Sequence, residues 1–142
     1  DMINSLTLEL LPVHSKEDQR LRVMVDGKPL LSMFETYESR FTDTIAGAYT
    51  DWLTVGDLKL RMLSSGERFM PLACDCGEWE CWFVTGAVHI SNGFVSWHQW
   101  RNPYRDKQVK PTNEHWCYKD FPSIVFEESQ YRATIADAIA AL

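Results

Sequence analysis

Four cysteines are the residues of this chain best suited to chemistry, and three of them lie within eight positions. Cys74, Cys76 and Cys81 stand in the sequence Cys-Asp-Cys-Gly-Glu-Trp-Glu-Cys, and Cys117 follows far along the chain. Thiolates are preferred ligands of structural zinc, and thiols that are close in sequence on a glycine-bearing turn can supply several of its four ligands. The spacing therefore predicts a structural zinc site formed by Cys74, Cys76 and Cys81, with Cys117 or His115 as the fourth ligand.

Two other uses of the same thiols stay open. Reduced cysteines are often buried and pack as small hydrophobic side chains. A catalytic or redox-active thiol needs a neighbouring base that lowers its pKa, and His89, His98 or His115 would serve only if the fold brings it close. A permanent disulfide is disfavoured in a reducing cytoplasm. The gap of one residue between Cys74 and Cys76 is shorter than the usual gap between zinc-binding thiols, so buried reduced thiols remain as good an interpretation as zinc.

Acidic and aromatic side chains alternate with these cysteines. Asp75, Glu78 and Glu80 surround Trp79. If the thiols turn inward, the acidic groups are left to face the solvent around an indole ring. Large aromatic side chains anchor many protein interfaces, and complementary charge speeds the encounter of two partners. The stretch therefore predicts a surface that binds a basic protein, with Trp100 as a second aromatic anchor.

The cysteine stretch lies between segments with the alternating apolar and polar residues of β-strands. This alternation predicts a series of strands, over 6–10, 21–25, 52–62, 82–90, 94–100 and 124–126. Asp26-Gly27 and Asn92-Gly93 are suited to the positive φ angles of tight hairpin turns. We therefore expect antiparallel hairpins at both pairs, with 29–31 as the return limb of the first. Trp82 and Trp97 lie in strong strand patterns and are expected in the core.

Two helices complete the expected set of elements. A weak helical pattern covers 33–48, and a clear one covers 127–142, where one apolar stripe contains Tyr131, Ile135, Ala138, Ile139 and Leu142. Glu127 and Gln130 have the spacing of a capping box at the start of this helix. A helix of this kind needs an apolar surface to cover. We therefore predict a single α+β domain over residues 1–142, with a curved antiparallel sheet of about six to eight strands and the C-terminal helix packed on one face.

Carboxylates are dense in the middle third of the chain. They are Glu35, Glu38, Asp43, Asp51 and Asp57. Their spacing matches neither a calcium-binding loop nor the paired carboxylates of a glycosidase. We therefore expect them to form a solvated face.

Composition and charge limit the classes of function. The chain has 142 residues, of which 45% are hydrophobic and 24% charged, values typical of one globular domain. The net charge of −6 opposes attraction to the phosphates of a nucleic acid. No apolar run approaches the roughly 20 residues that cross a bilayer, and the first residues lack the pattern of a signal peptide. We therefore expect a cytoplasmic protein that binds neither nucleic acid nor membrane.

Three short motifs in the second half of the chain occur together in a known group of proteins. The motifs are Cys-x-Cys-Gly with a nearby Cys-Trp, then Val-x-Trp, and finally an apolar residue and Phe followed by an acidic residue and Gln-Tyr. Here they are matched by Cys74, Cys76, Gly77, Cys81 and Trp82, by Val95 and Trp97, and by Val125, Phe126, Glu127, Gln130 and Tyr131. In these motifs the chain resembles a group of small uncharacterised bacterial proteins. The resemblance implies a common fold and, because the group has no established activity, no catalytic residues.

These observations favour a binding protein. Small size, acidity, many aromatic residues, the lack of a recognised catalytic motif and the bacterial resemblance fit an immunity protein, which neutralises a bacterial toxin by binding it. The alternative is a zinc- or thiol-dependent enzyme, or a zinc-stabilised domain, centred on Cys74, Cys76 and Cys81. Carbohydrate binding by the tryptophans ranks third.

Overall fold

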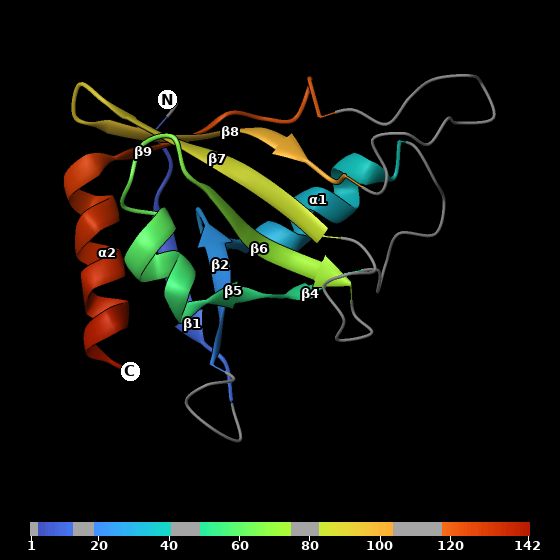
Figure 1. The fold of residues 1–142 in the computed structure, drawn as a ribbon. Helices are drawn as coiled ribbons and strands as arrows, with labels where there is room; N and C mark the ends of the chain where they lie inside the picture. Colours follow the sequence, from blue (N-terminus) through green and yellow to red (C-terminus); the bar gives the residue numbers. More distant parts are fainter. Residues whose placement is uncertain (1–2, 13–18, 41–48, 75–82, 104–117) are drawn as a thin grey trace.

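The computed structural model of the chain describes residues 3–12, 19–40, 49–74, 83–103 and 118–142 (Figure 1). These residues form a single α+β domain with nine strands in two antiparallel sheets and a C-terminal helix, which confirms the predicted fold class. The strand number slightly exceeds the prediction of six to eight, because two of the nine strands have only two residues. No helix among the described residues is long and apolar enough to cross a membrane.

The first sheet is built on the N-terminal strands. β1 (Leu6–Leu10) pairs along its whole length with β2 (Arg20–Val25), whose alternate residues are buried. Asp26 and Gly27 have φ angles of 54° and 79°, as a tight hairpin turn requires, and this confirms the predicted turn. The return strand β3 (Lys28–Pro29) is shorter than expected. The helix α1 (Leu30–Glu38) begins directly after it.

The second sheet contains the strongest hairpin of the chain. Its strand order is β4-β6-β7-β8-β9, formed by Tyr49–Asp51, Arg68–Cys74, Phe83–Ser91, Phe94–Arg101 and Ile124–Glu127. Asn92 and Gly93 form the turn between β7 and β8 with φ angles of 55° and 83°. The hairpin predicted from Asn-Gly is therefore confirmed.

A single extended segment joins the two sheets. Its first part, β4, pairs with β6, whereas its second part, β5 (Leu53–Thr54), pairs with β2 of the first sheet. Between them the Trp52 amide donates to the carbonyl of Pro71 at 2.8 Å. At the opposite border the amide of Asn4 donates to the carbonyl of Val125 in β9 at 2.6 Å. The sheets therefore curl around one core as a strongly curved half-barrel (Figure 1).

The C-terminal helix α2 (Glu128–Ala140) packs on β1, β8 and β9. Its residues Tyr131, Ile135 and Ala138 are buried and Ile139 is half-buried, in agreement with the predicted apolar stripe, but Leu142 of that stripe lies beyond the helix and is 38% exposed. The predicted capping box is wrong, because the Glu127 side chain makes no capping bond and Gln130 has another role. The Gln130 side chain donates to the Leu6 carbonyl at 3.0 Å and accepts from the Leu6 amide at 3.3 Å. Gln130 therefore links the helix to β1.

The strand predicted up to residue 62 is also wrong in its second half. Beyond β5 the chain forms a π-helical turn over Asp57–Arg61. Leu58 and Met62 are fully buried, but Leu60 between them is 67% exposed. The three apolar residues alternate in sequence, yet only the two that lie four residues apart share a face, which is helical spacing.

The start of this turn explains why helical geometry prevails. The Asp57 carboxylate accepts from the amide of Thr54 at 3.2 Å and from its hydroxyl at 3.0 Å. In return the Thr54 hydroxyl accepts from the Asp57 amide at 3.1 Å. Reciprocal bonds of this kind satisfy amides at a helical start, so they favour a turn over a continued strand.

A β-bulge in β8 places two tryptophans on the same side of the sheet. Trp97 and Trp100 are three residues apart, so a regular strand would point them to opposite faces. Gln99 adopts a φ of 51° where the pairing with β7 shifts, and this extra residue turns Trp100 into the core. Gly86 makes room for it, because a Cβ at this position would lie 2.5 Å from the Trp100 ring.

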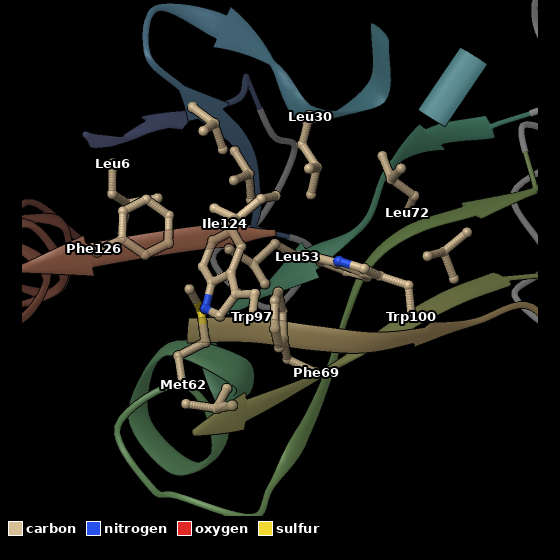
Figure 2. Close-up of a cluster of buried hydrophobic side chains, with 14 of the residues drawn as sticks. Leu6, Leu30, Leu53, Met62, Phe69, Leu72, Trp97, Trp100, Ile124 and Phe126 are labelled. Atoms are coloured by element: carbon tan, nitrogen blue, oxygen red, sulfur yellow. The ribbon is translucent and has the colours of Figure 1, made fainter. Parts of the chain in front are cut away.

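Trp97 is the centre of the core between the second sheet and α2. Figure 2 shows its ring among Phe69, Phe126 and Met62. The ring centroids of Phe69 and Phe126 each lie 4.8 Å from that of Trp97. The indole nitrogen donates to the Tyr131 hydroxyl at 3.2 Å, and that hydroxyl donates to the Met62 carbonyl at 2.7 Å. We call these five residues the Trp97 cluster; its buried polar atoms are hydrogen-bonded to one another.

Candidate binding site at one end of the second sheet

Several connections of the chain start and finish at one end of the second sheet. β4 begins at Tyr49, which pairs with Cys74, the last residue of β6. β7 begins nearby at Phe83, and β8 ends at Arg101, opposite Thr85 of β7. The connections 41–48, 75–82 and 104–117 therefore each attach to this end, which we call the connection end.

A buried carboxylate lies at the connection end. Glu38, the last residue of α1, is 0% exposed. The Tyr49 hydroxyl contacts its two oxygens at 2.7 and 2.9 Å, and the Tyr118 hydroxyl donates to it at 2.5 Å. The Asn102 amide donates to the Tyr49 oxygen at 2.9 Å. We call these four residues the Glu38 network; they come from α1, from β4 and from both sides of the connection 104–117.

The hydroxyl groups make this burial tolerable. A carboxylate removed from water is costly unless hydrogen-bond donors replace the lost water. Burial, the nearby Tyr49 and Glu38, and the hydrogen bonds to them raise the pKa of Tyr118 far above its usual range. Tyr118 therefore keeps its proton and acts as a permanent donor to Glu38. The network holds together elements that are up to 80 residues apart in sequence.

The solvated face predicted for the middle carboxylates is wrong for three of them. Glu38 is enclosed as described. Asp51 is buried against Arg22, whose Nε lies 3.0 Å from it, and Asp57 is buried with Arg61 at 3.2 Å. Glu35 is half-buried, and Asp43 lies outside the described residues. The partner of Asp57 lies four residues along the chain, but the partners of Glu38 and Asp51 lie 11 to 80 positions away, and spacing does not reveal them.

Only some of the residues predicted to bind a metal or a partner lie within the described residues. Cys74 is the last residue of β6 and is 4% exposed. Cys76, Cys81 and Cys117 lie outside the described residues, as do Asp75, Glu78, Trp79 and Glu80. Within the described ranges there is no group of three side chains suited to a metal ion. Zinc binding and the acidic surface therefore stay predictions.

Trp100 requires a correction. The sequence predicts it as an anchor for a partner, but it is 6% exposed and packs into the core. Its ring lies 5.1 Å from that of Phe34 and 5.8 Å from that of Phe121. The bulge at Gln99 is the physical reason, since it reverses the side to which Trp100 points. Trp97, which is expected in the core, is fully buried and confirms that prediction.

The two described histidines lie away from Cys74. His89 and His98 are exposed on β7 and β8, and their ring centroids are 6.0 Å apart. Partial burial, and then the charges of His89 and Arg68, lower the pKa of His98. Cys74 follows the residue that pairs with Phe83, and His89 lies six residues farther along β7, which is about 20 Å at the rise of a strand. His89 is therefore too far from the Cys74 thiol to act as its base.

Sequence patterns do not indicate the Glu38 network. Tyr49 and Tyr118 carry no motif, and Asn102 lies at the start of a charged segment whose composition predicts a surface loop. Only the folded arrangement brings the four residues together. Comparisons of the chain with models of protein families, with curated proteins and with solved structures find no match.

Proposed function

We propose that the connection end is a protein-binding surface, and that the chain is a small acidic binding protein of the immunity type that neutralises a bacterial toxin. The observation that carries this proposal is the attachment of three connections to one end of a hydrogen-bonded sheet. Binding residues often lie in connections that a rigid scaffold positions. The connection 75–82 has three acidic residues, two tryptophans and no lysine or arginine. It suits a basic partner.

The Glu38 network supports this proposal because it holds the bases of two of these connections. Glu38 and Tyr49 flank 41–48, whereas Asn102 and Tyr118 flank 104–117. Their mutual bonds restrict how far these ends move apart. A binding surface that is ordered before contact loses less entropy on association, and this raises its affinity.

Charge supports a basic partner as well. The net charge of −6 attracts a positively charged domain over several ångströms and speeds encounter. The stretch around Trp79 adds an aromatic anchor to this attraction. We therefore expect association that slows as salt is added, because salt screens the attraction.

The test needs a basic toxin domain, and the genes that neighbour the gene of this chain are the first place to search for one. Binding of this domain to the protein is measured by titration calorimetry, with the wild type and with the double variant Glu78→Lys, Glu80→Lys. We expect at least a tenfold loss of affinity. The matched control, Glu67→Lys with Asp137→Lys, changes the charge equally at two exposed positions away from the connection end. Equal losses in both variants, or none in the first, would contradict the proposed surface.

A zinc-stabilised domain, or a zinc- or thiol-dependent enzyme, is a second candidate. One contact favours it: Tyr118 directly follows Cys117, and its hydroxyl reaches Glu38 together with that of Tyr49, which pairs with Cys74. The chain next to the fourth cysteine therefore belongs to the end of the sheet at which Cys74 lies. Metal analysis of protein purified without added zinc should then give one zinc ion per chain, and Cys74→Ser should lower that content. Four titratable thiols of ordinary reactivity and no metal would remove this candidate.

A further inference from the structure

A cavity of about 590 Å³ is lined by residues from the end of β1, the start of β2, β5 with the segment after it, and the chain just beyond α2. Its volume is typical of sites that bind small molecules, which range over roughly 300–1,000 Å³. The segment 49–54 leads from the connection end to this cavity, a distance of about 17 Å at the rise of a strand. The cavity is therefore separate from the proposed protein-binding surface, and a ligand could occupy it whether or not that surface binds a partner.

Two cations are among the residues that line the cavity. They are Arg20 of β2 and Lys59 of the π-helical turn. In the described part of the chain neither of them has a carboxylate partner within ion-pair distance. The Arg20 guanidinium lies 4.6 Å from the centre of the Trp52 ring, and its Nη1 donates to the Gln19 carbonyl at 3.3 Å. Arg20 is therefore held in place before any ligand arrives.

One donor of this fixed guanidinium is unused. The Nε of Arg20 is buried and has no hydrogen-bond acceptor in the described ranges. A buried donor without an acceptor is destabilising, and most buried polar groups in proteins are paired. Because this nitrogen has almost no surface open to solvent, an anion in the cavity would meet the other guanidinium nitrogens of Arg20, whose planar arrangement suits a carboxylate particularly well.

The cavity also has apolar lining residues. They include Leu10, Val55 and Leu142, and both leucines are large exposed hydrophobic residues, with 37% and 38% of their surface open to water. Covering such residues with hydrocarbon is favourable in proportion to the area removed from water. A ligand that suits both kinds of lining residue has one anionic head joined to an apolar tail.

We propose that this cavity binds a carboxylic acid with a medium-length hydrocarbon tail. Its carboxylate would contact Arg20 and Lys59, and its tail would lie along Leu10, Val55 and Leu142. The two cations favour an anionic head, and the apolar residues favour a hydrocarbon tail. The site would give the protein a ligand-binding function that is independent of the cysteines.

The test titrates the full chain with sodium decanoate below its micelle concentration, using calorimetry. We expect saturable binding with one decanoate per chain, and at least tenfold weaker binding of decanol, which keeps the tail but lacks the charge. Arg20→Gln should weaken decanoate binding at least tenfold. Lys59→Glu should do the same, and because Lys59 is exposed this variant is expected to keep the fold. The matched control Arg132→Gln removes an exposed cation of α2 that pairs with Glu128, and it should leave affinity within twofold.

Two results would overturn the proposal. The first is the absence of decanoate binding to the wild type. The second is decanoate binding that neither Lys59→Glu nor Arg20→Gln weakens in folded protein, since this would show adsorption of the tail without the cationic site. Circular dichroism of each variant establishes the folded state before titration.

Discussion

The Trp97 cluster and the Glu38 network both bury tyrosine hydroxyl groups, but the hydroxyl partners are neutral in the first and a carboxylate in the second. In the first, the Tyr131 hydroxyl joins the Trp97 indole to a backbone carbonyl, so every member is neutral. In the second, two tyrosine hydroxyls surround the carboxylate of Glu38. A neutral pair adds to an apolar core at little cost, whereas a buried carboxylate is weak evidence for stability because of its desolvation.

The difference separates two tasks within one domain. The Trp97 cluster lies between the second sheet and α2, where side chains need only to fill the interior and to pair its buried polar atoms. The Glu38 network lies where the connections attach, and its directional bonds set the positions of the chain ends. We therefore interpret the first region as the main source of stability and the second as a positioning device, and three predictions test that contrast.

The largest effect is expected in the Trp97 cluster. Trp97→Ala removes a fully buried ring and leaves the Tyr131 hydroxyl without one partner. Large aromatic side chains truncated in a core cost about 3–5 kcal/mol, a sizeable part of the stability of a domain. Urea unfolding followed by circular dichroism should show a loss of this size. Leu60→Ala, at a residue that is 67% exposed, is the matched control and should change stability by less than about 0.5 kcal/mol. If Trp97→Ala lowers the free energy of unfolding by less than about 1.5 kcal/mol, this cluster is not the main source of stability.

The sequence predicts one of these two regions much better than the other. Local signals are sufficient for the strands that flank the Asn92-Gly93 turn, for β9 and for α2, because turn geometry and apolar periodicity act over a few residues. The buried position of Trp97 follows from the same alternation. These elements form most of the Trp97 cluster.

Contacts that the alternating pattern does not show cause the failures. At the π-helical turn they are local, because the bonds between Thr54 and Asp57 span three residues and compete with the alternation. The burial of Trp100 depends instead on a bulge opposite Gly86 of the neighbouring strand. The Glu38 network joins residues that are 11 and 80 positions apart. A carboxylate that becomes buried has no local mark in the sequence that separates it from one facing water.

The second prediction concerns Glu38. Glu38→Gln keeps the size of the side chain but replaces one oxygen that accepts from tyrosine with a donor. Hydrogen bonds to a charged group contribute about 1.5–3 kcal/mol, and we expect a loss of unfolding free energy in this range. The positioning role predicts a second result: faster amide hydrogen exchange at Tyr49 and Asn102 under native conditions, and weaker binding of the toxin domain.

Glu35→Gln is the control for this experiment, since Glu35 lies on the same helix and is only half-buried. It should leave both stability and exchange nearly unchanged. If Glu38→Gln lowers stability but leaves exchange at Tyr49 and Asn102 as in the wild type, the network contributes to stability without positioning the connections. If neither quantity changes, the bonds to the carboxylate have no measurable role.

The smallest effect should appear at high pH, where the two buried tyrosines can be compared directly. Burial raises the pKa of both; for Tyr131 the bond from Trp97 and the charge of Arg132 partly oppose the rise, whereas for Tyr118 the nearby Glu38 and Tyr49 add to it. In the unfolded chain a tyrosine loses its proton at about pH 10. Above that pH the unfolded state binds fewer protons than the folded state, so stability falls as pH rises. The contribution of each group is complete below about pH 10 and is lost above it.

Tyr118→Phe and Tyr131→Phe should each make this fall shallower by one proton, which is about 1.4 kcal/mol for each pH unit. Urea unfolding at intervals between about pH 9.5 and 11.5 measures the slopes, with the wild type in the same buffers. As pH rises further, Tyr131 should ionise in the folded protein before Tyr118 does, because the Trp97 indole donor and the Arg132 charge favour its ionised form. The slope of stability against pH in Tyr131→Phe should therefore return to the wild-type slope earlier than the slope in Tyr118→Phe. A wild-type slope that Tyr118→Phe leaves unchanged would show that Tyr118 ionises in the folded protein, and a permanent donor to Glu38 would then be ruled out.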